Sequence, residues 1–202
     1  MKVLEVSARK GGVGTTTVAC ALALALSKWS PNGVLLIDTQ ENGEAFSVLC
    51  LSAPTGRESA SIGENNLTVV NVPLSEVDNG LSVSQYEFVV IDADKTSVGK
   101  SYFGLDPFRV AVVRNSYLSL RAETLARGLA KDAVVSIHDK ESVLTENDTR
   151  VVLGVPSVTV FALDNAVARA IDAGLFSSRE HLWDNWTRQF IRSHGLVKSV
   201  AV

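Results

Sequence analysis

The chain has 202 residues, of which 46% are hydrophobic and 20% charged, and its formal net charge is −3. This composition is typical of a globular protein, and the length suits a single domain over 1–202 with a well-buried core. The weakly acidic balance excludes a strongly basic overall field. Any contact with nucleic acid therefore requires a local basic patch or an oligomer.

Strand-like and helix-like segments alternate along the whole chain. The strands are expected at 3–8, 33–38, 67–72, 86–92, 108–113, 133–138 and 157–163. The helices are expected at 15–29, 43–51, 116–130, 164–174 and 177–195, with one more beginning after Thr145. Segment 52–66 is rich in Ser, Gly, Glu and Asn and is expected to form a loop. The alternation predicts an α/β fold of three layers, with a mostly parallel twisted sheet and helices on both faces.

Several local signals refine these elements. Thr145 with Asp148 three residues later predicts a capping box, and Asp164 and Gly174 are expected to begin and end a helix. Cys20 and Cys50 lie in apolar runs without metal-ligand spacing and are expected to be buried free thiols. The N-terminus lacks the pattern of a signal peptide, and the longest apolar run, 18–26, is too short to cross a bilayer. We therefore expect a cytoplasmic protein.

A glycine-rich loop separates the first strand from the first helix, in the stretch SARKGGVGTTT at 7–17. Backbone N–H groups of such a loop, together with the helix N-terminus, converge on phosphate groups. The alternative is an ordinary glycine turn, which the density of glycine and threonine disfavours. The hydroxyl of Thr16 occupies the place of a Mg²⁺ ligand. The predicted phosphate-binding residues are Gly11, Gly12, Val13, Gly14, Thr15, Thr16 and Thr17.

The stretch RKGGVGTTT resembles the deviant Walker A loop of the ParA/MinD family of P-loop ATPases, whose usual form is K-G-G-V-G-K-T-T. The resemblance implies that Lys10 is the signature lysine, which reaches across a nucleotide-sandwich homodimer to the ATP of the partner subunit. The ordinary Walker lysine is replaced by Thr15. Because one charge-assisted contact is lost, binding of ATP should weaken by about 1.5–3 kcal/mol without vanishing. Dependence on Lys10 of a second subunit should grow.

Two carboxylates, Asp38 and Asp92, end apolar strands. Ligands of open parallel sheets bind beyond the carboxyl ends of the strands, so both side chains can converge on Mg²⁺ beside the loop. Each alone could also be a turn or cap residue. By resemblance, Asp92 matches the Walker B aspartate and Asp38 matches the first aspartate of the switch motif D-x-D-P-Q.

The second aspartate of that switch motif, which positions the attacking water, is replaced by Gln40. A glutamine orients water through its amide but accepts no proton. ATP hydrolysis is therefore expected to be slow or to depend on a partner.

The adenine site is assigned only by resemblance. Asn115 is placed near the adenine, and a helix cap is the alternative. The stretch FALDNAVARAIDAG resembles the family segment whose backbone cradles the base, which implies that Leu163, Asp164 and Val167 line the adenine pocket.

The resemblance implies a positioning protein driven by ATP and Mg²⁺. The first hypothesis is a small ParA-like partition protein that dimerises with ATP, binds DNA nonspecifically and associates with the nucleoid. Its partner would be a centromere-binding ParB-like protein. The second hypothesis is a scaffold of the MinD, pilus-assembly or cellulose-biosynthesis type with little hydrolysis. A third, a metabolic P-loop enzyme, requires substrate-binding residues that we do not identify.

The surface residues bear on the choice between DNA and membrane. Candidate DNA contacts are Arg121, Arg127, Arg179, Arg188, Arg192 and Lys198, and a solvated helix face is the alternative. The last helix carries an apolar stripe formed by Leu182, Trp183, Trp186, Phe190 and Ile191. Such a stripe suits either a membrane-surface helix or core packing, and core packing is the expectation.

Overall fold

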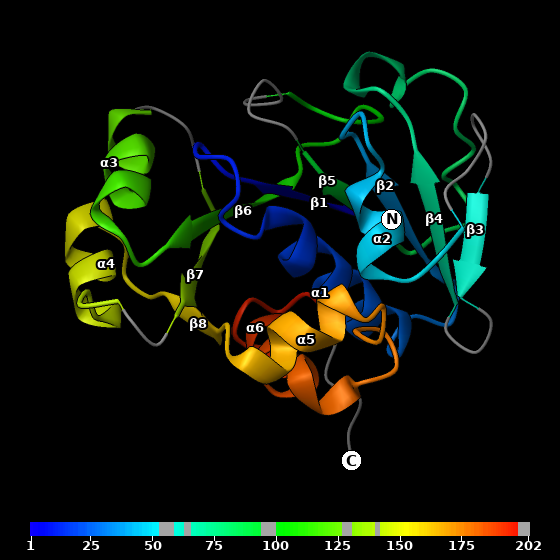
Figure 1. Ribbon diagram of the computed structural model, residues 1–202. Coiled ribbons are helices and arrows are strands. Elements are labelled where there is room, and N and C mark those ends of the chain that lie inside the picture. The colour runs from blue at the N-terminus through cyan, green and yellow to red at the C-terminus, as the bar shows by residue number, and fades with distance from the viewer. Residues whose placement is uncertain (53–58, 63–65, 94–99, 127–130, 140–141, 198–202) are drawn as a thin grey trace.

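The protein is described by a computed structural model, which covers residues 1–52, 59–62, 66–93, 100–126, 131–139 and 142–197. These residues form one eight-stranded sheet with the order β3-β4-β2-β5-β1-β6-β7-β8 (Figure 1). The strands are β1 (Lys2–Ser7), β2 (Val34–Asp38), β3 (Ser59–Ile62), β4 (Leu67–Asn71), β5 (Phe88–Asp92), β6 (Phe108–Arg114), β7 (Ala133–His138) and β8 (Thr159–Ala162).

The sheet is parallel except at one edge, where β3 pairs antiparallel with β4. The mostly parallel sheet is therefore confirmed. The loop expected over 52–66 is wrong at 59–62, because this serine-containing segment forms β3. An edge strand needs a backbone partner on only one side, so it can form without an apolar pattern. The remainder of that segment, 53–58 and 63–65, lies outside the described residues.

Helices cover both faces of the sheet, as expected. One face is packed by α1 (Thr15–Ser27), α2 (Glu44–Val48), α5 (Asn165–Asp172) and α6 (Asp184–Ser193). On the other face, α3 (Tyr117–Leu125) and α4 (Glu146–Leu153) lie over β6 and β7. Two single-turn 3₁₀ helices, η1 (Leu74–Glu76) and η2 (Glu180–Leu182), complete the described helices. Loop residues and η1 cover the rest of this second face.

The central helix α1 is buried from Val18 to Ser27 because it is apolar nearly all round and lies between the sheet and α6. The apolar stripe of the last helix packs into the same core. The ring of Trp186 stacks on that of Phe161 at a centroid distance of 4.8 Å. The indole N–H of Trp183 donates to the carbonyl of Phe176 at 3.0 Å. Core packing of the stripe is thus confirmed, and little of it is left for a membrane surface.

The helix ends follow the sequence signals. Thr145 and Asp148 form the predicted capping box, and the Asp164 carboxylate accepts the backbone N–H groups of Ala166 and Val167. Gly174 follows α5 with a φ of +65°.

The expectation for the cysteines is correct for Cys20, which is buried, and wrong for Cys50, which is exposed. Cys50 follows the short helix α2 with a φ of +56°. This turn directs the chain out of the core at the end of an apolar run. A Cβ on Gly174 would lie 2.7 Å from the Cys50 sulfur, so the absence of a side chain at Gly174 leaves room for the Cys50 thiol.

Candidate functional site

The site forms where β1, β2 and β5 end side by side. In the sheet register, Asp38 lies opposite Asp92, and Asp92 lies opposite Val6 at the end of β1. The glycine loop leaves β1 at Ser7, directly beside these two carboxylates. Because neighbouring parallel strands end together, three segments distant in sequence meet at one edge of the sheet.

The glycine loop turns sharply into α1. Gly12 and Gly14 have φ values of +72° and +98°, which L side chains rarely adopt. Gly14 is the residue preceding the first turn of α1, and its carbonyl accepts the N–H of Val18 at 3.1 Å. A Cβ on Gly14 would lie 2.5 Å from the Cδ1 atom of Ile137 in β7. Glycine is therefore favoured here by its backbone conformation, and any Cβ would also have to displace the end of the Ile137 side chain.

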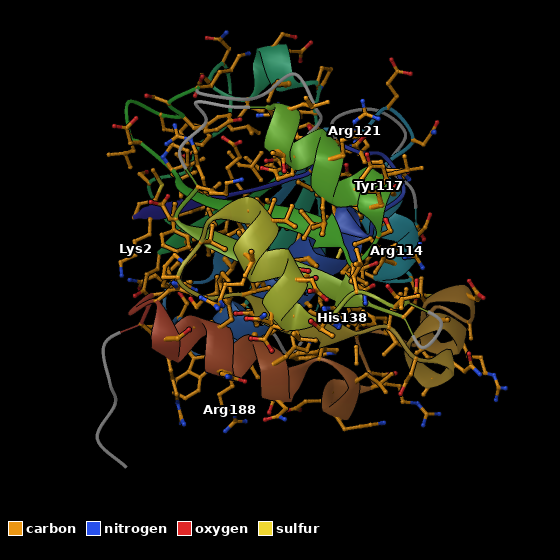
Figure 2. The ribbon with its side chains drawn as sticks, turned by 90° about the vertical axis from the view of Figure 1, so that its left-hand side faces the viewer. Lys2, Arg114, Tyr117, Arg121, His138 and Arg188 are labelled. Carbon is orange, nitrogen blue, oxygen red and sulfur yellow. The ribbon has the colours of Figure 1, made fainter. Side chains whose placement is uncertain are left out.

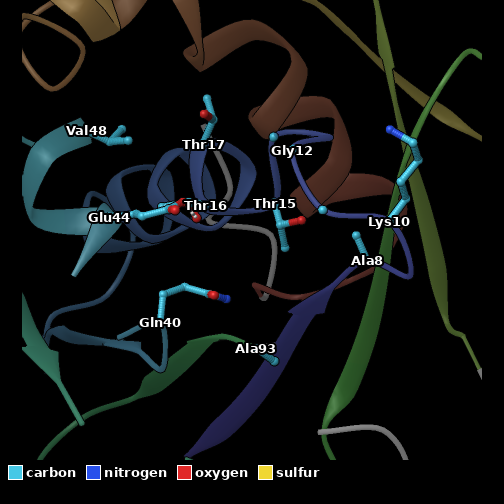
Figure 3. A pocket seen from close by; sticks show the side chains of 12 residues that line it. Ala8, Lys10, Gly12, Thr15, Thr16, Thr17, Gln40, Glu44, Val48 and Ala93 are labelled. Atoms are coloured by element: carbon cyan, nitrogen blue, oxygen red, sulfur yellow. Dashed lines mark hydrogen bonds between the residues drawn. The ribbon is translucent and has the colours of Figure 1, made fainter. Parts of the chain in front are cut away.

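A cavity of about 600 Å³ opens above this loop (Figure 3). The predicted residues that line it are Lys10, Gly11, Gly12, Gly14, Thr15, Thr16, Thr17 and Gln40, and the others are Ala8, Glu44, Val48 and Ala93. Val13 is instead buried in the core. The volume and the exposed helix N-terminus suit a phosphate-bearing small molecule.

Asp92 lies fully buried at the end of β5, next to Ala93 of the cavity lining, and neither of its carboxylate oxygens has a hydrogen-bond partner within the described part of the chain. Burial raises the pKa of Asp92 to about 8. The nearby Thr16 hydroxyl opposes this rise in the pKa, whereas the charges of Asp38 and Glu44 add to it. An unpartnered carboxylate beside a threonine hydroxyl offers the oxygen donors that Mg²⁺ prefers. These residues fit a magnesium ion, although no cluster of three or more ready-made metal ligands occurs among the described residues.

Both carboxylate oxygens of Asp38 accept hydrogen bonds from backbone N–H groups of the loop that follows β2. Its Oδ1 atom accepts the N–H of Gln40 and its Oδ2 atom accepts the N–H of Ala45, each at 2.8 Å. Burial raises its pKa, and the two backbone bonds oppose that rise. Asn71 donates to the carbonyls of Asp38 and Gln40 at 3.0 and 2.7 Å and fixes the same turn. The side chain of Gln40 is thereby positioned at the cavity wall.

Lys10 stands at the rim of the cavity. It is exposed and forms no hydrogen bond or ion pair with any residue that the structure describes. Figure 3 shows its side chain on the far side of the loop from Thr16 and Glu44. Thr15 also lines the cavity but brings no charge.

The residues assigned to the adenine do not line this cavity. Asp164 caps α5, Val167 is buried in the core, and Leu163 packs against the core. Asn115 is buried, and its amide donates to the carbonyl of Leu144 at 3.2 Å beside a separate hollow of about 410 Å³. The alternative role of Asn115 as a helix cap is wrong, because Ser116 precedes the first turn of α3.

One residue of the site, Glu44, has no clear signal in the sequence. Glu44, the first residue of α2, lines the cavity, and its Oε2 atom accepts a hydrogen bond of 3.3 Å from the Thr16 hydroxyl. An acidic residue in a first helical turn is common, so the sequence signal was only a preference for a helix N-terminus. The contact across 28 residues of chain is visible only in the fold.

The candidate DNA contacts are spread over the surface. Arg179, Arg188 and Arg192 are exposed near the end of the chain, and Arg121 is exposed on α3. Figure 2 shows Arg121 and Arg188 near opposite ends of one face, with α4 between them. Arg188 donates to Asp184 at 2.6 Å, so part of its charge is neutralised. Arg127 and Lys198 lie outside the described residues.

The strand order, the glycine loop at the end of β1 and the buried acid at the end of β5 define a P-loop NTPase fold. No protein-family model and no curated protein matches the sequence. Solved structures do match. MinD of Pyrococcus horikoshii, in complex with Mg-ADP, gives a TM-score of 0.71 at 17% identity, over 98% of this chain and 99% of that one. McdA of Cyanothece, a D38A variant in complex with ATP, gives 0.69 at 14% identity, over 100% and 99%.

A ParA-family ATPase of Chlorobium tepidum gives a TM-score of 0.60 at 17% identity, over 97% of this chain and 98% of that one. The chain therefore has the particular P-loop fold shared by MinD and the ParA-family ATPases. No helix within the described ranges is long and apolar enough to span a membrane.

Proposed function

We propose that the protein is a ParA/MinD-type nucleotide switch, which binds ATP with Mg²⁺ in the cavity and forms an ATP-dependent homodimer. One observation carries the proposal. Lys10 stands exposed at the rim of the cavity, which Thr15 also lines without bringing a charge. Because Lys10 pairs with none of the described residues of its own chain, its ammonium group is available to contact the phosphates bound by a second copy.

The residues around the cavity have distinct roles in this proposal. The loop from Gly11 to Thr17 and the N-terminus of α1 hold the phosphates. Thr16, Asp38 and Asp92 hold Mg²⁺, which supplies positive charge at the β and γ phosphates. The adenine extends toward Asn115 and the segment with Leu163, Asp164 and Val167.

Hydrolysis is proposed to be slow. Gln40 lines the cavity where it can orient a water molecule, but its amide accepts no proton. Both carboxylate oxygens of Asp38 accept backbone N–H groups of the loop, so neither oxygen is available to accept a proton from water without breaking one of these hydrogen bonds. A partner protein that reshapes this loop would accelerate the reaction.

The proposed cargo is DNA. In this proposal the dimer binds DNA nonspecifically through the exposed arginines of its last helix and of α3, and a centromere-binding ParB-like protein stimulates it. Dimerisation would place two copies of each arginine set on one particle, so the local basic contacts double even though the net charge of −3 per chain doubles as well. The protein would then accompany the nucleoid.

A second candidate is a positioning scaffold with little catalysis, of the kind that organises a division site, a pilus or a cellulose synthase. The observation that favours it is the ion pair between Arg188 and Asp184, which neutralises part of the charge of one candidate DNA contact. Gln40 in place of a carboxylate also suits a protein that binds ATP without rapid turnover.

DNA retention separates the two candidates. The purified protein is applied to immobilised duplex DNA of random sequence with Mg-ATP, with Mg-ADP and without nucleotide. Retention that requires ATP and falls steeply with salt supports the partition function. Equal passage through the column under all three conditions favours the scaffold.

A further inference from the structure

Glu44 is held against the phosphate loop by the architecture of the β2–α2 connection. The bond from the Ala45 N–H to Asp38 Oδ2 fixes the first turn of α2 beside the end of β2. As a result, the Oε2 atom of Glu44 accepts a hydrogen bond of 3.3 Å from the Thr16 hydroxyl (Figure 3), a contact that a bound metal ion would replace. The backbone on both sides of this contact is anchored, since Thr16 belongs to the first turn of the buried helix α1.

The spacing of these two oxygens suits a shared magnesium ion. Mg²⁺ demands nearly octahedral geometry with ligands at about 2.1 Å, so neighbouring ligand oxygens lie about 3 Å apart. The separation between Glu44 and Thr16 is close to this value. Both oxygens of the buried Asp92, which is near enough to Thr16 and Glu44 to interact with them, lack a hydrogen-bond partner among the described residues.

The charges around the cavity make a metal ion more important here than in an ordinary P-loop. Of the described residues that line the cavity, only Lys10 is cationic, and it lies across the loop from Thr16. Thr15 supplies no charge, while Glu44, Asp38 and Asp92 are all acidic. Among the residues that line the cavity, the charged side chain nearest Thr16 is therefore the carboxylate of Glu44, which would repel phosphates that enter without a cation.

On the basis of the nucleotide site proposed above, we infer that Glu44 is a further carboxylate of the metal site and that the metal ion replaces the missing lysine. Glu44 holds the divalent cation against Thr16 and Asp92. The cation then provides the positive charge that Thr15 cannot provide. Nucleotide binding and metal binding are therefore strongly coupled, and Glu44 favours the metal-bound nucleotide while it repels the metal-free one.

Manganese binding tests this inference directly. Mn²⁺ is titrated into the protein at a saturating concentration of ADP, and free Mn²⁺ is measured by electron paramagnetic resonance. Glu44→Gln should raise the Kd for Mn²⁺ by about tenfold or more, as expected for loss of a group that holds a metal. Glu44→Ala, which removes both oxygens, should weaken binding at least as much. Glu41→Gln is the matched control, because Glu41 is exposed on the same loop outside the cavity lining.

The coupling gives a second readout with the opposite sign. Binding of a fluorescent ADP analogue is measured in EDTA, where Glu44→Gln should tighten it because one repulsive charge is removed. A general loss of structure would weaken nucleotide binding in both conditions, so opposite changes in one variant report the charge itself. Thermal melts of both Glu44 variants should match that of the control, since the side chain is exposed.

The outcomes separate this inference from the proposed function. If the unaltered protein binds ADP but the Mn²⁺ affinity is the same with Glu44→Gln as with Glu41→Gln, the metal role of Glu44 is refuted and the nucleotide site stands. If the unaltered protein binds no nucleotide with or without metal, the proposed function fails and this inference falls with it.

Discussion

Asp38 Oδ2 accepts a hydrogen bond of 2.8 Å from the backbone N–H of Ala45, which ties the end of β2 to the first turn of α2. A buried carboxylate thus shapes the loop that carries Gln40 and Glu44. Side chains from this loop face the glycine loop because the backbone between them is fixed. The arrangement allows the chain to present a preformed wall to the phosphates.

Lys10→Ala should abolish dimerisation with Mg-ATP, because Lys10 is the residue expected to reach the phosphates of the partner subunit. Binding of a fluorescent ATP analogue at low protein concentration should change little, since Lys10 lies at the rim. Size-exclusion chromatography with light scattering measures the dimer. Lys2→Ala, at the other end of β1, is the control and should dimerise normally. A Lys10→Ala protein that still dimerises would refute the trans-acting lysine.

Thr15→Lys should tighten binding of Mg-ATP by roughly tenfold to a hundredfold, because it restores a charge-assisted contact of about 1.5–3 kcal/mol. Calorimetry at a fixed Mg²⁺ concentration measures the change. Thr15→Gln has a similar length without the charge and should bind like the unaltered protein. Equal or weaker binding by Thr15→Lys would mean that position 15 does not face the phosphates.

Gly14→Ala should lower the free energy of unfolding more than Gly12→Ala. Both substitutions place a side chain at positive φ, which costs about 1–2 kcal/mol. Only at Gly14 does the new Cβ also meet Ile137, at 2.5 Å from its Cδ1 atom. Urea titration compares the two variants, and Ile137→Val should recover part of the loss caused by Gly14→Ala. Equal losses would contradict the packing of the loop on β7.

Asp92→Asn should raise the melting temperature of the metal-free protein by an amount that grows with pH. The pKa of Asp92 is raised from 3.8 to about 8 by burial, so the folded state binds the proton more tightly than the unfolded state. Its contribution to stability is present at low pH and is lost as the pH rises through about 8. Asparagine does not titrate, so its advantage is small near pH 4 and largest near pH 8.

Thermal melts in EDTA at several pH values test this prediction. A constant difference between Asp92→Asn and the unaltered protein would show that Asp92 is charged in the folded state throughout. Added Mg²⁺ should stabilise the unaltered protein at pH 8, together with nucleotide, and should have little effect on Asp92→Asn.

Much of the fold could be predicted from the sequence because its strands are short apolar runs separated by clear turns. The runs that end in Asp38 and Asp92 are buried on both faces, as continuous apolar strands usually are. The caps at Thr145 and Asp164 were readable because capping depends on residues only two or three positions apart. The edge strand β3 could not be predicted, because its sequence has no periodic apolar pattern and its pairing with β4 is visible only in the fold.

The site was predictable only where local sequence determines it. The glycine loop lies between one strand and one helix, so its position followed from neighbouring residues. The contact of Glu44 with Thr16 depends on how α2 returns to α1, and Asn115 proved to lie at a separate hollow beside Leu144. Such relations depend on packing between distant segments, which residue spacing does not specify.

The most direct test of the central claim is sedimentation velocity of the unaltered protein over a series of concentrations, with and without Mg-ATP. We predict single chains without nucleotide and a concentration-dependent dimer with Mg-ATP. Single chains at every concentration in Mg-ATP, or the same dimer without nucleotide, would contradict the claim that Lys10 of a second copy completes the phosphate site.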